Sequence, residues 1–303
     1  MMNDLTVVLL CHNRPNFAVE AIESIMRQSN SSFDFLVSDN STNDQLQKVM
    51  KADFPAIKTI LWESDIASQY DHFNKIIAHI ETKYVVLFND DDLMSSNYVM
   101  RILQQFKETP NAVAISVNGS FIDEKSRRVD HSGGHFSFMA TENSLVFNDS
   151  RTLVERYLTE DSGSVAPFSS YTYNLKKIKD LRLDFNRGGN YCDTVFLMDV
   201  ANRGAIVWIN EPLVQTRVHE ERLSTKCGVR DYKGFIATIL QGNYGKINQF
   251  FIDEYRFRHL FYQLRIRKRF PAPALKFIFR MISLLIIRSP AFRKKVFTRL
   301  FRR

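Results

Sequence analysis

The sequence predicts an α/β fold in which a mostly parallel central sheet is flanked by helices. Over the first 120 residues, short apolar runs of strand length alternate with segments of helical periodicity. The apolar runs are continuous rather than alternating, which is typical of strands buried on both faces. Short connections between the segments favour parallel strands joined by crossover helices, which is a Rossmann-like arrangement.

The elements follow from the period of the apolar residues. Continuous apolar runs predict strands at Thr6–Leu10, Phe33–Val37, Ile57–Trp62, Tyr84–Phe88 and Ala112–Val117. Helical spacing predicts helices at Asn16–Gln28, His72–Ile80 and Tyr98–Phe106. The order of these segments gives the alternation of strand and helix on which the fold class rests.

The next hundred residues continue the pattern less regularly. The polar stretch from Asn118 to Ser150 contains Gly133-Gly134 and predicts a hairpin or a long loop over a site. Further strands are predicted at Phe168–Leu175, Ile206–Ile209 and Leu213–Val218. A helix is predicted at Cys192–Asn202, ending before Gly204 as a C-terminal cap.

After about Asp231 the chain becomes helical and basic. We expect one long helix at Phe235–Arg269, ended by Pro271 and Pro273. Leu275–Ile287 is apolar nearly all round, and Phe292–Arg303 is amphipathic with basic residues on its polar half. We therefore divide the chain into an α/β domain at 1–230 and a basic helical extension at 231–303.

The charge is divided unequally along the chain. The formal net charge is +8, yet residues 256–303 hold 15 Lys and Arg and no Asp or Glu. The first 255 residues hold 26 basic against 33 acidic residues. Such asymmetry indicates a nucleic-acid or membrane partner for the C-terminal part rather than for the whole protein.

Composition and missing motifs exclude several classes. A hydrophobic fraction of 45% is too high for a disordered chain. Cys11, Cys192 and Cys227 are too few and too far apart for a disulfide framework or a Cys-rich zinc site, which fits a reducing compartment. No basic region precedes the first apolar run, so we expect no signal peptide. Glycine-rich dinucleotide and Walker motifs and a Gly-x-Ser-x-Gly elbow are absent from the sequence.

Polar segments follow three predicted strands, and parallel strands bring such segments to one edge of the sheet. They begin at Cys11, Ser38 and Asn89. In the third, Asp90, Asp91 and Asp92 repel one another unless a cation neutralises them. Mg²⁺ or Mn²⁺ suits a site with few carboxylates plus water and diphosphate oxygens. The alternative is a solvated acidic loop that caps the following helix.

Five segments in order resemble the motifs of the family 2 glycosyltransferases, which have the GT-A fold. They are Val7–Pro15, Phe35–Ser41, Tyr84–Asp92, Cys192–Leu197 and Pro212–His219. The resemblance spans about residues 5–225. It implies an enzyme that transfers a sugar from a nucleotide donor, with the ligands at the carboxyl edge of the sheet.

The resemblance also implies roles for individual residues. Asp39 would read the nucleotide base, and Asn13, Arg14, Asn74, Asp90 and Asp91 would contact the nucleotide. Asp90, Asp92 and His219 would hold Mn²⁺ or Mg²⁺, and Arg217 would contact the diphosphate. Asp193 would be the catalytic base of an inverting transfer, taking the proton of the acceptor hydroxyl.

Each role has a plainer alternative in the sequence. Asp39 is also suited to an Asx-turn with the polar residues after it, and Asp193 to capping the helix that it opens. His219 and Arg217 are also compatible with an ordinary loop histidine and a surface arginine. These alternatives stay open from the sequence alone.

Three interpretations of residues 256–303 compete. The amphipathic composition favours an anionic membrane surface, because Phe and Leu occupy one half of the helix and Lys and Arg the other. Nucleic acid is not expected, since the aromatic residues lie at helix-face spacing. A structural helical cap with a solvated basic face is the third.

The sequence therefore predicts a metal-dependent, inverting glycosyltransferase with a UDP-linked donor. Its acceptor would be a lipid-linked glycan in bacterial surface polysaccharide synthesis, for example of lipopolysaccharide O-antigen. The expected location is the cytoplasmic side of the cell membrane, as a peripheral protein. The alternative is a non-catalytic protein that binds a nucleotide-sugar, or nucleic acid through the basic extension.

Overall fold

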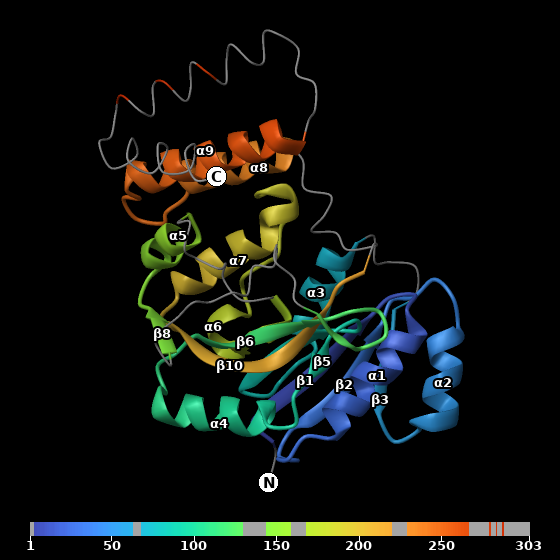
Figure 1. The fold of residues 1–303 in the computed structure, drawn as a ribbon. Helices are drawn as coiled ribbons and strands as arrows, with labels where there is room; N and C mark the ends of the chain where they lie inside the picture. Colours follow the sequence, from blue (N-terminus) through green and yellow to red (C-terminus); the bar gives the residue numbers. More distant parts are fainter. Residues whose placement is uncertain are drawn as a thin grey trace.

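The described part of the chain forms a ten-stranded mixed sheet at the centre, with helices on both of its faces (Figure 1). The structure is a computed structural model that describes residues 3–62, 68–129, 144–158, 168–219 and 229–266, together with 279, 283 and 287. The strand order is β3-β2-β1-β4-β9-β6-β10-β5, with β7 added beside β6 and β8 beside β10. This confirms the predicted α/β class with a mostly parallel sheet.

The elements have the following bounds. The strands are β1 (Leu5–Cys11), β2 (Asp34–Asp39), β3 (Lys58–Leu61), β4 (Tyr84–Asn89), β5 (Leu93–Met94), β6 (Ala114–Ile122), β7 (Arg128–Val129), β8 (Ser144–Phe147), β9 (Thr172–Asn174) and β10 (Ile206–Arg217). The helices are α1 (Pro15–Met26), α2 (Gln45–Asp53), α3 (Gln69–Ala78), α4 (Tyr98–Glu108), α5 (Ser150–Leu158), α6 (Leu175–Ile178), α7 (Cys192–Ala201), α8 (Val229–Gln241) and α9 (Gln249–Ile266). Two 3₁₀ turns are η1 (Phe168–Ser170) and η2 (Gly189–Tyr191).

The N-terminal half of the sheet is parallel. β1 pairs with β2 on one side and β4 on the other, and β2 pairs with β3, all in the parallel sense. The carboxyl ends of β1, β2 and β4 therefore meet at one edge, as the sequence predicts. β9 pairs antiparallel with both β4 and β6, joining this half to the parallel pair of β6 and β10.

Two apolar layers hold the helices to the sheet. Residues of alternating register in β1 point to opposite faces, so Val8 packs with α3 and α7, while Val7 and Leu9 pack with α1 and α4. Both faces of the strand are thus buried, which is why its sequence is continuously apolar. Phe235 in α8 and Ile252 in α9 belong to the α7 layer, so these two helices pack on the body (Figure 1).

The predicted long helix at Phe235–Arg269 is wrong in one respect. The described part is two helices, α8 and α9, separated at residues 242–248. Gly245 there has a positive φ of 76°, a conformation in which glycine avoids the strain of a Cβ atom. The described part of the chain includes no helix with the length and apolar character to cross a bilayer. Nearly all of Leu275–Ile287 and all of Phe292–Arg303 lie outside the described residues.

Two other predictions needed correction. The strand predicted at Phe168–Leu175 is a 3₁₀ turn followed by the three-residue β9, and the two strands predicted at 206–218 are one strand, β10. Register shifts in β10 between Ile209, Pro212 and Val214 mark a bulge, which explains the break in its apolar pattern. Helix α2 was not predicted.

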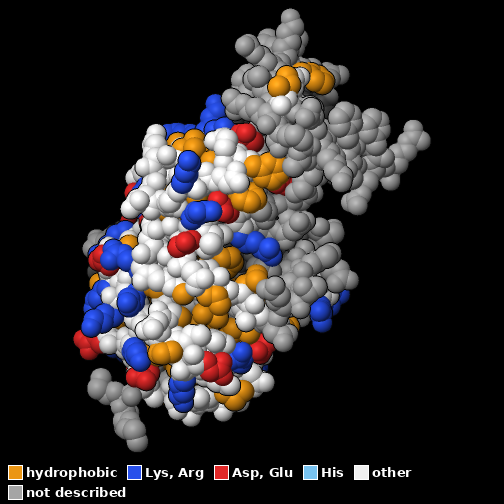
Figure 2. All heavy atoms as spheres, turned by 90° about the vertical axis from the view of Figure 1, so that its left-hand side faces the viewer, with side chains coloured by type: hydrophobic (Ala, Val, Ile, Leu, Met, Phe, Trp, Pro, Cys, Tyr) orange, Lys and Arg blue, Asp and Glu red, His pale blue; other side chains and the backbone are white. Residues whose placement is uncertain are grey.

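Charged side chains of both signs are interspersed over the face where α4, β8 and α5 lie (Figure 2). Lys and Arg alternate with Asp and Glu there, and exposed apolar side chains are scattered among them. Such mixing is typical of a solvated protein surface. This face therefore does not carry the positive excess that the total charge suggests.

We expect Tyr98→Phe to lower the free energy of unfolding by about 1–2 kcal/mol, because the change removes a buried hydroxyl that contacts two polar groups. That hydroxyl donates to the Ser170 carbonyl oxygen at 3.0 Å and lies 2.9 Å from the Thr172 hydroxyl. Tyr173→Phe is the matched control, since its buried hydroxyl has no hydrogen-bond partner among the described residues. Urea unfolding should show a loss only for Tyr98→Phe; equal losses would contradict this account.

Candidate active site

Arg14 joins two adjacent carboxylates at the carboxyl edge of the sheet. Its Nη2 lies 2.7 Å from Asp90 Oδ1, and its Nη1 donates to Asp91 Oδ2 at 2.6 Å. Asp90 is fully buried and also accepts from the backbone N–H of His12 at 2.9 Å. The segment after β1 is thus tied to the segment after β4, as the sequence predicts from their shared edge.

His219 faces the same carboxylate as Arg14. Its Nε2 lies 2.9 Å from Asp91 Oδ2 and 3.5 Å from Arg14 Nη1. The imidazole follows directly from β10, so this strand delivers it to the edge where β1 and β4 end. Asp91, Arg14 and His219 form one contact group that draws on three separate strands.

The buried charges shift the carboxyl pKa values in opposite directions. Burial raises the pKa of Asp90 and outweighs the lowering effect of Arg14. Burial acts in the same sense on Asp91, but the hydrogen bond with His219 and the charge of Arg14 prevail and lower its pKa. Asp91 therefore keeps its negative charge to lower pH than Asp90 does.

Asp92 has a different environment from its two neighbours. Its Oδ2 accepts a short hydrogen bond from Ser169 in η1, and its Oδ1 accepts from the backbone N–H of Arg217 at 3.1 Å. The carboxylate is nearly fully buried. Asp92 thus links β10 and η1 to the end of β4. The carboxylate that contacts His219 is that of Asp91, and not that of Asp92 as expected.

The guanidinium of Arg217 is committed to protein acceptors. It donates to the carbonyl oxygens of Asp91 (2.9 Å), Asp123 (3.1 Å) and Glu124 (3.3 Å), to the Ser126 hydroxyl and to the Glu20 carboxylate. The group also lies 4.5 Å above the Phe17 ring. Its side chain is buried, so this geometry supports a structural role rather than the expected diphosphate contact.

Asp39 forms the Asx-turn with one carboxylate oxygen and leaves the other oxygen without a hydrogen-bond partner among the described residues. Its Oδ1 accepts from the backbone N–H of Ser41 at 2.9 Å, which is the Asx-turn alternative. Its Oδ2 is buried and has no hydrogen-bond partner among the described residues. A buried carboxylate oxygen without a donor is costly, and a base N–H would satisfy it.

Asn13 holds the turn after β1 against the turn after β2. It adopts a positive φ of 56°, which asparagine tolerates better than most residues. Its side-chain oxygen accepts from the backbone N–H and the hydroxyl of Thr42 and from the Asn43 amide. The structure therefore places Asn13 beside the Asp39 turn, where it organises the edge.

Asn74 lies outside this contact group. Its amide nitrogen donates to the Leu183 carbonyl at 2.9 Å, and its amide oxygen accepts from the Leu183 N–H at 2.8 Å. This reciprocal pair fixes the segment after α6 against α3. The geometry gives Asn74 a structural role and does not support the expected nucleotide contact.

Asp193 is the second residue of α7, and among the described residues it makes no hydrogen bond or ion pair with Arg14, Asp91 or His219. Its Oδ1 accepts from the backbone N–H of Thr194 at 2.6 Å. Burial raises the pKa of Asp193 above its ordinary value, against the lowering effect of the Thr194 hydrogen bonds. A carboxyl of raised pKa is suited to accept a proton near neutral pH.

The turn ahead of Asp193 is shaped by two glycines. Gly188 and Gly189 have φ values of 108° and 59°. A Cβ atom on Gly189 would collide with the Asp231 carboxylate of α8, which also accepts from the Asn190 amide at 3.2 Å. Helix α8 therefore helps to hold the turn that delivers Asp193.

The donor set fits a divalent cation in part. Among the described residues, no group of three or more His, Cys, Asp or Glu side chains has metal-site geometry. Asp91 and His219 nevertheless offer an oxygen and a nitrogen donor at 2.9 Å from each other. Two protein donors suit Mg²⁺ or Mn²⁺ when a bound diphosphate and water supply the remaining ligands.

The sequence did not indicate every residue of this region. Ser169 and Glu20 contact Asp92 and Arg217 from positions far away in the chain. A lone Ser and a lone Glu carry no local pattern. Only the fold brings them to the site.

Comparisons with known proteins agree with this architecture. A family model described as Glycosyl transferase family 2 matches residues 6–188. An uncharacterized glycosyltransferase of Rickettsia felis is 26% identical over 140 residues, which cover 43% of this chain and 22% of that protein. The teichoic acid poly(glycerol phosphate) polymerase of Staphylococcus epidermidis is 27% identical over 116 residues, covering 37% and 16% respectively. The aligned regions thus span about a fifth of these relatives.

Solved structures share the fold at low identity. S. aureus TarS 1–349, in complex with UDP-GlcNAc, has a TM-score of 0.63 and 15% identity, covering 93% of this chain and 80% of that one. The mannosyltransferase PcManGT from Pyrobaculum calidifontis, in complex with GDP-Man and Mn²⁺, has a TM-score of 0.51 and 14% identity, with coverage of 96% and 72%. The fold is therefore that of these glycosyltransferases.

Proposed function

The chain belongs to glycosyl transferase family 2, and on that premise we propose that it transfers a sugar from a UDP-linked donor to an acceptor glycan. The observation that carries the donor site is the buried Asp39 Oδ2, which lacks a donor among the described residues at the carboxyl edge of the sheet. A nucleobase N–H is the complementary group. The complex of the similar TarS structure with UDP-GlcNAc supports the uridine donor.

The Arg14 group would bind the diphosphate end of the donor. Arg14 already bridges Asp90 and Asp91, and its charge is complementary to a diphosphate oxygen. Asp91 and His219 would hold Mn²⁺ or Mg²⁺, and Asp90 would hold Arg14 beside them. Bound there, a divalent ion would stabilise the charge that develops on the leaving diphosphate.

Asp193 would act as the base of an inverting displacement. It takes the proton of the acceptor hydroxyl while that oxygen bonds to the anomeric carbon. The bond from the anomeric carbon to the diphosphate breaks, and its electron pair leaves with the nucleoside diphosphate. The buried position and raised pKa of Asp193 support this role.

The donor proposal predicts a ligand-dependent gain in stability. UDP at a hundredfold excess over its Kd, with Mn²⁺, should stabilise the protein by about 2.7 kcal/mol and raise its Tm. Asp91→Asn should remove the Mn²⁺-dependent part of this shift, and Asp39→Ala should weaken UDP binding. Glu23→Gln, an exposed acid on α1, is the control. A shift seen with oligonucleotides but not with UDP would favour the non-catalytic alternative.

The base proposal predicts a specific pH profile. Transfer should rise with pH through the raised pKa of Asp193, because only the carboxylate accepts the proton, so the acid limb lies at higher pH than an ordinary aspartate would give. Asp193→Asn should lower turnover roughly 10²–10⁴-fold and abolish this limb, with donor affinity retained. Steady-state rates between pH 4 and 9 test this. Unchanged turnover in Asp193→Asn would exclude Asp193 as the base.

We further propose that residues 256–303 hold the enzyme on an anionic membrane, where a lipid-linked acceptor would be presented. Full-length protein should float with vesicles that contain phosphatidylglycerol. The double change Lys294→Glu and Lys295→Glu should reduce flotation, because each basic residue contributes about 1 kcal/mol at an anionic surface. Lys48→Glu with Lys51→Glu, on α2, is the charge-matched control. Equal flotation of both variants would exclude this anchor.

A further inference from the structure

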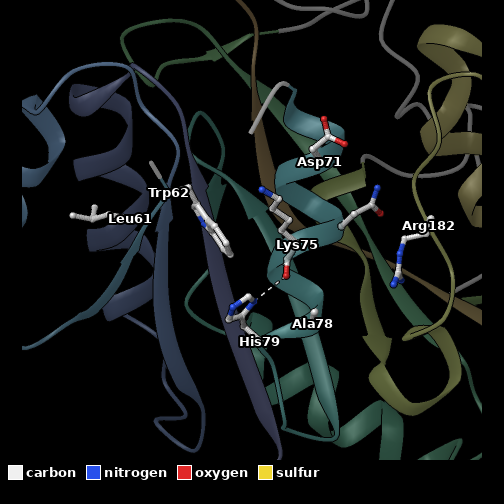
Figure 3. A pocket seen from close by; sticks show the side chains of 8 residues that line it. Leu61, Trp62, Asp71, Lys75, Ala78, His79 and Arg182 are labelled. Carbon is white, nitrogen blue, oxygen red and sulfur yellow. Dashed lines mark hydrogen bonds between the residues drawn. The ribbon is translucent and has the colours of Figure 1, made fainter. Parts of the chain in front are cut away.

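A groove of about 820 Å³ lies over the exposed side of α3, outside the contacts described for the donor site (Figure 3). The groove is lined by residues of α3, of the chain at the end of β3 and of the segment after α6. They include Trp62, Asp71, Asn74, Lys75, His79 and Arg182. Trp62 and Arg182 lie on opposite sides of α3 in this view. The volume is that of a site for a ligand of several rings.

One wall of the groove is a fixed aromatic surface. The Trp62 indole N–H donates to the Ser38 hydroxyl at 2.8 Å, and that hydroxyl lies 2.6 Å from His72 Nε2. Burial lowers the pKa of His72 to about 4, so the imidazole is neutral and can accept a hydrogen bond from the Ser38 hydroxyl. The His79 ring meets Trp62 edge to face at 5.1 Å. The wall is therefore preorganised.

The opposite wall is equally well held. The reciprocal pair between Asn74 and the Leu183 backbone fixes the segment that carries Arg182. The Arg182 Nη1 donates to the carbonyl oxygens of Lys179 and Leu181, and the side chain is exposed. The guanidinium is thus presented at the groove on a rigid loop.

The charge of the lining favours an anionic ligand. Among the described lining residues, Lys75 and Arg182 are basic and Asp71 is acidic. Asp71 accepts from the Ser68 hydroxyl at 2.8 Å, at the start of α3, where the helix dipole also stabilises its charge. A polyhydroxylated chain with anionic groups would meet both cations and could lay a ring on Trp62.

The groove also adjoins the neighbourhood of Asp193. Tyr70, next to Asp71 on α3, stacks on the exposed Phe185 at 5.2 Å. Tyr70 is close enough to Cys192 and Asp193 for both to contribute, after burial, to its raised pKa. Tyr70 and Phe185 therefore form an aromatic step between the groove and the start of α7.

We propose that this α3 groove binds an anionic segment of the acceptor glycan, while the reacting hydroxyl of the same chain lies at Asp193. The proposal rests on the proposed transfer reaction, and it adds the chemical class of the acceptor. Trp62 would stack on a ring, and Arg182 and Lys75 would pair with phosphate or carboxylate groups along the chain.

Tryptophan fluorescence of the full chain tests the groove directly. The protein has two Trp residues, and Trp208 is buried, so a ligand in the groove should change the emission of Trp62 alone. A glycerol phosphate hexamer and a galacturonate hexamer should both quench it, and 0.5 M NaCl should weaken this binding. Neutral maltohexaose and hexathymidylate should bind at least about tenfold more weakly.

Charge reversal locates the site. Arg182→Glu should raise the Kd of the anionic hexamers about tenfold, whereas Lys51→Glu, on the other face of the sheet, should leave it unchanged. An unchanged Kd in Arg182→Glu, equal binding of maltohexaose, or equal binding of hexathymidylate would overturn the proposal. Because no donor is present, a failure of UDP to bind would defeat the proposed reaction and leave this result standing.

Discussion

The burial of Asp90 and Asp92, on either side of the partly exposed Asp91 after β4, is the constraint on which the rest of the site depends. Asp90 and Asp92 are almost completely excluded from water, so each needs a partner supplied by the fold. Arg14 comes from the turn after β1, and Ser169 and the Arg217 N–H come from η1 and β10. The carboxylates thus fix the relative positions of segments that are far apart in sequence.

The three aspartates make different contacts because different elements surround them. Asp92 is enclosed by structural donors, whereas Asp91 faces His219 and the guanidinium of Arg14. The contacts with His219 and Arg14 lower the pKa of Asp91, whereas burial raises the pKa of Asp90.

Local patterns predicted the parts of the fold that are governed by local physics. Buried parallel strands and amphipathic helices impose a period on the sequence, so β1, β4 and α4 were placed within a few residues. The edge that collects Asp39, Asp91 and His219 followed from parallel topology and family resemblance. The contacts of Asn74 and Arg217 could not follow, because their partners are mostly backbone groups, and for Arg217 also distant side chains, whose positions only the folded chain defines. The division between α8 and α9 depends on a left-handed glycine, which the apolar period does not reveal.

The bulge in β10 has a consequence for how this site could change during evolution. Before the bulge, Ile206 to Ile209 run in phase with β6, and after it Val214 to Arg217 run in a shifted register. Residues on a strand alternate between faces, so the shift decides which side of the sheet receives each later side chain. Removing one residue there would turn the Arg217 side chain away from its hydrogen-bond acceptors and move His219 away from Asp91. The number of residues between Ile209 and Arg217 therefore sets which side chains of β10 reach the site.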